Sequence, residues 1–164
     1  MSPARPTSST KPVADSGNPK VATPDFVSSL ASTLVALSSA GPERASAEAY
    51  LDTLLHEHTG SVLSGLAQLG LSHPDHVQRV LAFVLLRRFA FRPLSSADPK
   101  SAPREVWDLV DDKTRTEVQD ALIQSLMQGA ARKEKERGVI CDVIAEVENA
   151  GVKRGGGAFF VHLC

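Results

Sequence analysis

The chain has 164 residues, enough for one ordinary domain, and its 18 Lys and Arg residues nearly balance its 19 Asp and Glu residues. The resulting net charge of −1 gives no general attraction to nucleic acid or to an anionic membrane surface. The two cysteines form no disulfide framework and no metal-ligand spacing, which is typical of a reducing intracellular compartment. The apolar run Val80–Leu86 lies between two arginines and is much shorter than the roughly 20 residues that a membrane span requires.

The first 23 residues contain no aromatic residue, no Leu and no Ile, and they lack the apolar core of a signal peptide. They are rich in Pro and Ser and cannot bury enough apolar surface to offset the entropy lost on ordering. We therefore expect residues 1–23 to form a disordered tail.

Two amphipathic helices are predicted next. Thr23 as a cap and Pro24 at the first helical position begin a helix that ends before Gly41. The apolar stripe of this helix comprises Phe26, Leu30, Leu34 and Leu37. A second helix over residues 42–57 follows, with Ala47, Tyr50, Leu51 and Leu54 at helical spacing.

A second pair is predicted over residues 61–71 and 75–91. The first of these helices has its apolar positions at Val62, Leu63, Leu66 and Leu69. The other carries one stripe of Val77, Val80, Leu81, Val84 and Leu85, while Phe83, Leu86 and Phe89 cover much of its remaining circumference. A helix that is apolar on so many sides is expected to pack against several neighbours, with Arg87 and Arg88 leaving the packed sides.

A looser connection, "RPLSSADPKSAP", and a short apolar element around Trp107 precede the third pair. Its helices are predicted over about residues 112–128 and 130–149, on either side of Gly129. The apolar positions of the last helix are Val139, Ile140, Val143, Ile144 and Val147. No strand is needed anywhere in the chain.

Three antiparallel helix pairs that begin near residues 25, 61 and 112 predict an all-α fold, an α-α superhelix with a repeat of about 40 residues. In such a solenoid each second helix lies between its own partner and the neighbouring repeats, the environment that residues 77–91 require. An irregular helical bundle is the alternative that the period alone leaves open.

Four segments, in order, resemble the importin-beta (karyopherin) family of transport receptors, and the importin subunit beta-3 type in particular. "RVLAFVLLRRFAF" is similar to the second helix of the family's second HEAT repeat, and "ERASAEAYLDTLL" to the second helix of its first repeat. "REVWDLVDDKTRTEVQDALIQSL" resembles the following connection and helix, and "KERGVICDVIAEVEN" the second helix of the third repeat. The resemblance extends from about Asp25 to Asn149.

The resemblance implies a HEAT/armadillo-like solenoid with repeats over about 24–58, 60–93 and 103–150, present in the cytoplasm and the nucleus. Receptors of this family carry cargo through the nuclear pore, and their N-terminal repeats bind the small GTPase Ran in its GTP form. The binding surface is formed by the second helices, which in this chain are residues 42–57, 75–91 and 130–149.

Four charged residues of these helices are candidates for partner contact because they lie away from the apolar stripes: Glu48, Asp52, Arg87 and Arg88. The alternative for each is a solvated face or an ion pair between repeats, worth about 0 to 1 kcal/mol.

The chain also departs from the family. The later repeats that hold most cargo contacts and the nucleoporin pockets are not present, and residues 151–164 are unlike the family, so we expect a truncated form. Without a following repeat, a face of the last helix with Val139, Val143 and Val147 is expected to stay open. Each exposed valine forgoes about 1.5 kcal/mol of burial, which predicts self-association of the isolated chain.

No enzyme is predicted, and no cofactor or metal. His56 and His58 face different directions on a helix, and His73 and His76 are separated by a proline in a turn. Cys141, within an apolar pattern, is expected to be a buried structural thiol. The charge run over residues 132–137 is expected to be solvated. The alternative function is a short HEAT scaffold, such as a regulatory subunit unrelated to transport.

Overall fold

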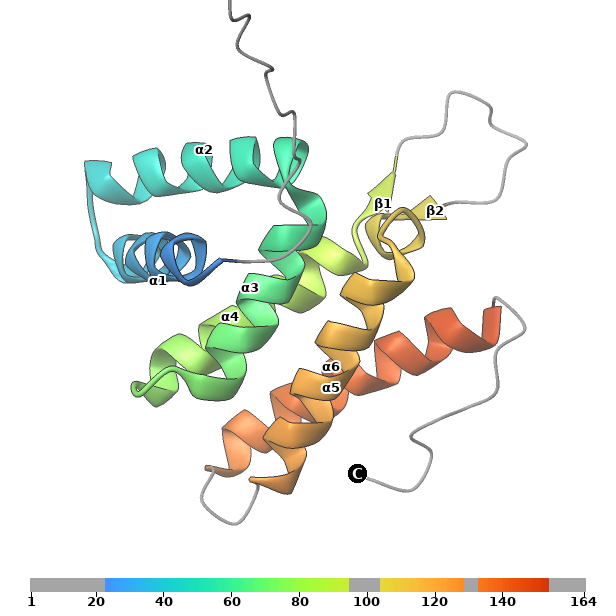
Figure 1. Ribbon diagram of the computed structural model, residues 1–164. Helices are drawn as coiled ribbons and strands as arrows, with labels where there is room; N and C mark the ends of the chain where they lie inside the picture. The colour runs from blue at the N-terminus through green and yellow to red at the C-terminus, as the bar shows by residue number, and fades with distance from the viewer. Residues whose placement is uncertain (1–22, 95–103, 129–132, 154–164) are drawn as a thin grey trace, which may run out of the picture.

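The computed structural model describes residues 23–94, 104–128 and 133–153, and this part of the chain is all-α (Figure 1). The predicted tails over residues 1–23 and 151–164 lie outside the described residues except for Thr23, before α1, and residues 151–153, which belong to α6. The helices are α1 (Pro24–Ser38), α2 (Pro42–Glu57), α3 (Thr59–Ser72), α4 (His76–Ala90), α5 (Asp112–Met127) and α6 (Glu134–Lys153). A short 3-10 helix, η1 (Val106–Asp108), precedes α5. Every predicted helix is present within a few residues, and α6 continues four residues beyond the predicted end at residue 149.

The starts of three helices are capped by side chains that the local sequence supplies. Thr23 accepts a hydrogen bond from the backbone N–H of Phe26 at 3.3 Å, and Pro24 begins the helix. Asp75 caps α4 and Asp111 caps α5 in the same way. Between α1 and α2 the chain turns at Gly41, whose φ of +129° is a conformation that L side chains rarely adopt.

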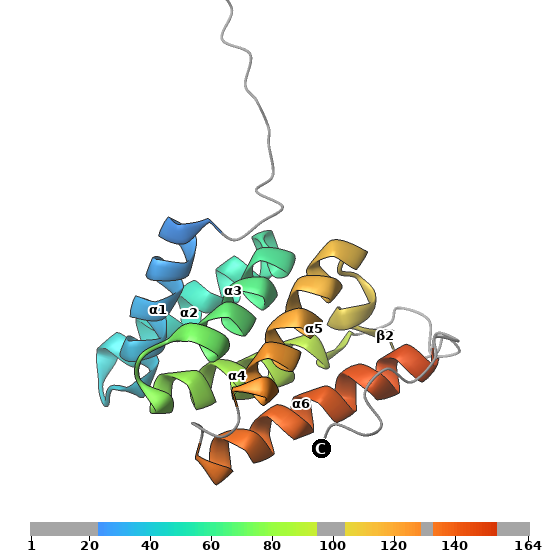
Figure 2. The ribbon, with the colours of Figure 1, turned by 60° about the horizontal axis from the view of Figure 1, so that its bottom comes forward.

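The helices form three antiparallel hairpins that stack into a superhelix. The first helices α1, α3 and α5 pack side by side, and the second helices α4 and α6 pack against each other (Figure 2). α2 packs on α1 and α3. The central helix α4 therefore contacts α1, α3 and α6, which confirms that it packs on more than one side.

The packed sides of α4 differ from the predicted stripe. Its buried residues are Gln78, Ala82, Phe83, Leu85, Leu86 and Ala90. Of the predicted stripe only Leu85 is buried, whereas Val77 is 52% exposed and Val84 is 44% exposed. The prediction was wrong for these two valines because the larger Phe83 and Leu86 fill the contact with the neighbouring helices.

A two-residue antiparallel ladder joins β1 (Pro93–Leu94) to β2 (Arg104–Glu105), with Pro93 opposite Glu105 and Leu94 opposite Arg104. The prediction that the chain needs no strand was therefore wrong at this point. The ladder closes the connection between the second and third hairpins and adds no layer to the helical array (Figure 1). Directly after it, Trp107 is buried against Phe91, with ring centroids 5.8 Å apart.

One hydrophobic core extends through all three hairpins. Val143 and Val147 of α6 belong to it and are buried, and Val139 is partly buried against it. The predicted open face of the last helix is therefore wrong, because α6 turns this face toward α4 and α5. In the part of the chain that is described, no helix combines the length and apolarity needed to cross a membrane.

Candidate partner interface

The two acidic candidates lie on α2, and both are exposed. Glu48 pairs with Arg44 one turn before it, with 2.9 Å between Oε1 and Nε. Asp52 lies near the end of α2, and its Oδ1 is 3.9 Å from Nη1 of Arg92, just after α4. This second contact joins the first hairpin to the second where α2 and α4 converge.

The two arginines of α4 have different surroundings although they are adjacent in sequence. Arg87 donates to Asp142 and to Glu146, one helical turn apart on α6, at 3.2 Å each. It forms an ion pair between repeats, which is the alternative that the sequence left open. Arg88 is exposed, and among the described residues no hydrogen bond or ion pair involves it. The partner role of all four candidates stays a prediction.

An exposed apolar stripe lies beside Arg88 on the same face of α4. Val77, Leu81, Val84 and Arg88 follow the spacing i, i+4, i+7, i+11, so they share one side of the helix. Val77 and Val84 are exposed, and Leu81 is partly buried. We call this set the α4 stripe. The sequence periodicity placed Val77, Leu81 and Val84 on one face of the helix. It assigned that face to the packed side, so the exposed surface was not predicted.

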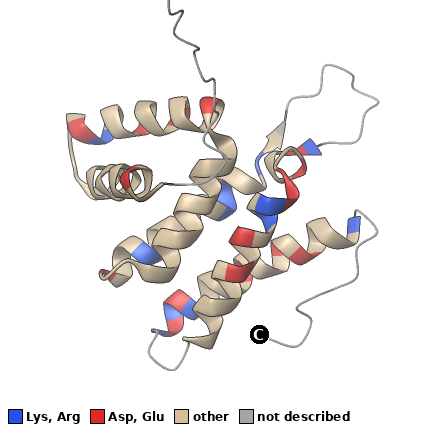
Figure 3. Cartoon of the chain, in the orientation of Figure 1, with Lys and Arg blue, Asp and Glu red and all other residues tan. Residues whose placement is uncertain are grey.

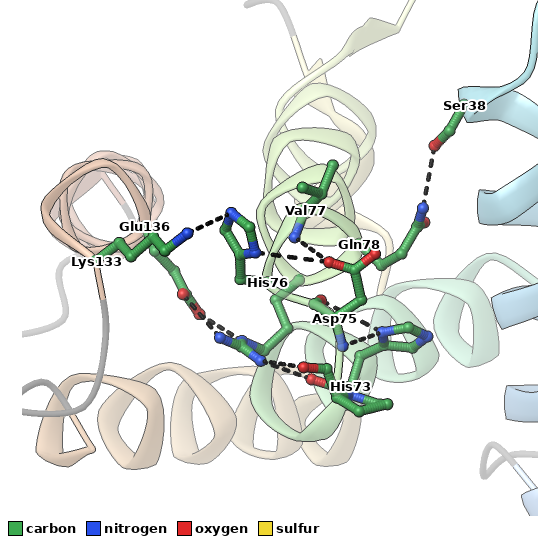
Figure 4. Close-up of polar contacts among 10 residues, drawn as sticks. Ser38, His73, Asp75, His76, Val77, Gln78, Lys133 and Glu136 are labelled. Atoms are coloured by element: carbon green, nitrogen blue, oxygen red, sulfur yellow. Dashed lines mark hydrogen bonds and ion pairs between the residues drawn. The ribbon is translucent and has the colours of Figure 1, made fainter.

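A hollow of about 420 Å³ adjoins the N-terminal end of the α4 stripe, between α4 and the start of α6. Its floor includes Val77 and Val80, and its lining otherwise comprises His76, Lys133, Glu134, Lys135 and Glu136. Figure 4 shows Lys133 and Glu136 facing the first turn of α4. Lys133 donates from Nζ to Nε2 of His76 at 3.1 Å, so this wall of the hollow is fixed by a polar contact.

A buried ion pair fixes the two helices that border the hollow. Glu136 is 1% exposed, and its two carboxylate oxygens accept hydrogen bonds from Arg79 at 2.7 and 3.1 Å. Arg79 also donates to the backbone carbonyls of His73 and Pro74. The hydrogen bond to Glu136 raises the pKa of Arg79, against the opposing effect of its own burial. The prediction of a solvated charge run over residues 132–137 was therefore wrong for Glu136.

A second cleft, of about 390 Å³, lies where the C-terminal ends of α2 and α4 meet η1. Its lining combines polar side chains, among them Asp52, His56 and Arg92, with apolar ones such as Leu55, Phe89 and Leu109. Figure 3 shows that the positions of the Lys and Arg residues alternate with those of the Asp and Glu residues along the described helices.

Two further predictions concern cysteine and metal chemistry. Cys141 is disulfide-bonded, which contradicts the expectation of a buried free thiol and of a chain without disulfides. The place of a cysteine in an apolar helical pattern does not determine whether its sulfur is free or bonded. The described residues contain no group of three or more His, Cys, Asp or Glu side chains arranged to hold a metal ion.

The fold and this surface define an all-α superhelix of helical hairpins with an exposed apolar stripe on one of its second helices. No protein-family model matches the sequence, and no curated protein or solved structure matches the chain.

Proposed function

We propose that this chain is a protein-binding module built from N-terminal HEAT repeats of the importin-beta type, and that it binds Ran in its GTP form. The observation that carries the proposal is the α4 stripe, an exposed apolar surface that ends in Arg88, which has no ion-pair partner among the described residues. It lies on a second helix, the element that the family resemblance assigns to partner contact. Exposed apolar side chains that gather on one face are typical of a protein interaction site.

The four candidate residues have graded roles in this proposal. Arg88 is the foremost contact, because its guanidinium has no competing carboxylate within the described chain. Arg87 pairs with Asp142 and Glu146 of α6, so its charge is already engaged within the chain. Glu48 and Asp52 are exposed on α2, where they pair with Arg44 and Arg92.

In a longer form of the protein, further repeats would carry cargo and contact nucleoporins, so the proposed process is protein import into the nucleus. The proposal assigns no catalytic residue and no cofactor. A stack of helical hairpins offers a long surface to a partner, and binding to that surface requires no chemistry.

The direct test is binding of the purified chain to Ran loaded with a non-hydrolysable GTP analogue or with GDP. We expect preference for the GTP form, and we expect Arg88→Glu to reduce it. Arg137→Glu is the matched control, because Arg137 is also an exposed arginine, on α6, with no ion pair in the described part. Equal binding of both nucleotide forms by a helical sample would reject the transport assignment.

A short HEAT scaffold for another partner is the second candidate. One observation favours it. Glu48, Asp52 and Arg87 each form an ion pair within the chain, so fewer of the candidate residues are available to contact Ran. This alternative predicts that neither nucleotide form of Ran binds, while substitutions in the α4 stripe still abolish binding of the true partner.

A further inference from the structure

The α4 stripe has a chemical character that specifies its partner more closely. Two exposed valines and a partly buried leucine form an apolar strip, with the hollow at one end and Arg88 at the other. At a rise of about 1.5 Å per residue, Val77 and Arg88 lie about 16 Å apart along the helix axis. The surface is therefore narrow and elongated, with an apolar depression at one end and the positive charge of Arg88 at the other.

The backbone of α4 excludes one class of ligand. Within a helix the N–H and C=O groups are bonded to each other, so the stripe offers no backbone partner to an incoming chain. An extended peptide would leave its own backbone groups unpaired against the valines, at a cost in free energy. A helix satisfies its backbone internally and presents only side chains, so it suits this surface better.

Size and charge restrict the occupant further. A standard stable interface between two folded proteins buries about 800 Å² per partner. The few partly exposed side chains of the α4 stripe supply far less, which argues against a second folded copy of the chain as the occupant. Arg88 lacks a carboxylate in the described chain, and a partner that brings one would complete a charge-assisted contact. The hollow of about 420 Å³ has room for a large apolar side chain.

We propose that the α4 stripe is a docking site for an amphipathic helix of a partner protein, which inserts a large apolar side chain between α4 and α6 and places a carboxylate on Arg88. The inference rests on the proposed function as a protein-binding module and adds the chemical class of the bound segment.

The test uses two synthetic helical peptides and the full chain. One peptide carries a leucine stripe with a central phenylalanine and glutamates at both ends, and the other has lysines in place of the glutamates. Fluorescence anisotropy is expected to show tighter binding of the acidic peptide by about tenfold or more. Arg88→Glu is expected to reverse this preference, and Arg137→Glu is expected to leave it unchanged.

A matched pair of valines tests the apolar contact. Val77→Asp is expected to weaken binding of the acidic peptide by about tenfold or more. An aspartate is compatible with the first turn of α4, because negative charge near a helix N-terminus is favourable. Val35→Asp is the control, since Val35 is 55% exposed but lies on α1. Circular dichroism of both variants establishes that they remain folded.

Several outcomes would overturn the docking inference. Equal affinity for the two peptides, no binding of either, or an equal loss from Val35→Asp would do so. A dimer of the unmodified chain in sedimentation that Val77→Asp converts to a monomer would show that a second copy occupies the stripe. Tighter peptide binding after removal of residues 154–164 would assign the stripe to the chain's own terminal segment.

The two proposals can fail separately. Peptide binding without preference for Ran-GTP would reject the transport assignment and keep the docking site. Preference for Ran-GTP that is insensitive to Val77→Asp, together with no peptide binding, would keep the transport assignment and reject the docking site.

Discussion

The ion pair between Arg79 and Glu136 shows how one buried charge can fix the position of two repeats. A carboxylate that is almost fully removed from water is tolerated because a guanidinium binds both of its oxygens. If one partner is removed, the other charge stays buried without compensation, which is far more costly than loss of an exposed pair. The pair therefore specifies the register of α6 on α4.

Arg79→Met is predicted to lower the free energy of unfolding by about 3–5 kcal/mol, because it leaves Glu136 buried and unpaired. The double variant Arg79→Met with Glu136→Leu is expected to recover most of this loss, since it removes the stranded charge. Urea denaturation followed by circular dichroism measures both. The control is Arg44→Met, which disrupts an exposed pair worth about 0.2–1 kcal/mol. A loss from Arg79→Met no larger than the control would contradict the prediction.

The pH dependence of this pair follows from the sign of the pKa shift. The pKa of Arg79 is raised in the folded chain, so the stabilisation that its charge provides is fully present below the ordinary pKa of a guanidinium. It is lost only as the pH rises through the raised value. Because Arg79 stays charged, its contribution to the free energy of unfolding is expected to stay constant between neutral and moderately alkaline pH. A series of urea denaturation curves over this pH range can verify it.

The sequence pattern of α6 indicates that Glu136 lies on the buried side, although its charge suggests a solvated residue. Glu136 lies four residues before Ile140, seven before Val143 and eleven before Val147, on the apolar side of α6. A register that places a carboxylate on a buried face implies a cationic partner on the next helix. The identity of that partner required the structure, because the sequence does not state how far α6 slides along α4.

At the scale of elements, α3 and α4 approach each other closely at Gly70. A Cβ atom at Gly70 would lie only 2.6–2.7 Å from ring atoms of Phe83, which is fully buried. Gly70→Ala is therefore predicted to destabilise the chain by about 1–3 kcal/mol through overpacking, despite the better helix propensity of alanine. Thermal denaturation measures the effect, and adding Phe83→Leu is expected to relieve part of it.

Gly138 provides the matched control for that substitution. It lies in α6, and a Cβ atom there would meet no other atom within 4 Å. Gly138→Ala is expected to stabilise the chain by about 0.5–1 kcal/mol, the ordinary helix gain of alanine over glycine. Equal effects of the two substitutions would show that the contact between Gly70 and Phe83 is not tight.

The order of helices was predictable from periodicity, but the orientation of α4 was not. On a helix with apolar residues on most sides, two faces compete for the core, and the sequence pattern does not rank them. Phe83 and Leu86 bury more surface than Val77 and Val84, so the valines remain outside. The ladder of β1 and β2 was missed because two residues are too short to form a periodic pattern.

At the scale of the whole molecule, the sequence predicted an exposed apolar face on the last helix, and the structure does not have it there. Val143 and Val147 were expected to form an open end of the array, yet both lie in the shared core. Exposed valines occur on α1 (Val35), α4 (Val77 and Val84) and α6 (Val152), and the two on α4 share one face of a helix in the middle of the array. The predicted self-association loses its basis, because the face of α6 that was expected to stay open is packed in the core.

The continuity of the core leads to a prediction for unfolding. Trp107 is the only tryptophan, and it is buried against Phe91 at the junction of the second and third hairpins. Because each hairpin completes its core on a neighbour, the loss of one exposes the next, and all three are expected to unfold in one transition. Tryptophan fluorescence and helical circular dichroism should therefore give the same midpoint in urea. A fluorescence change at lower urea than the loss of helix would mean that α5 and α6 detach as a separate unit. In that case Arg79→Met should widen the gap between the fluorescence midpoint and the circular dichroism midpoint, whereas in a single transition it should lower both together.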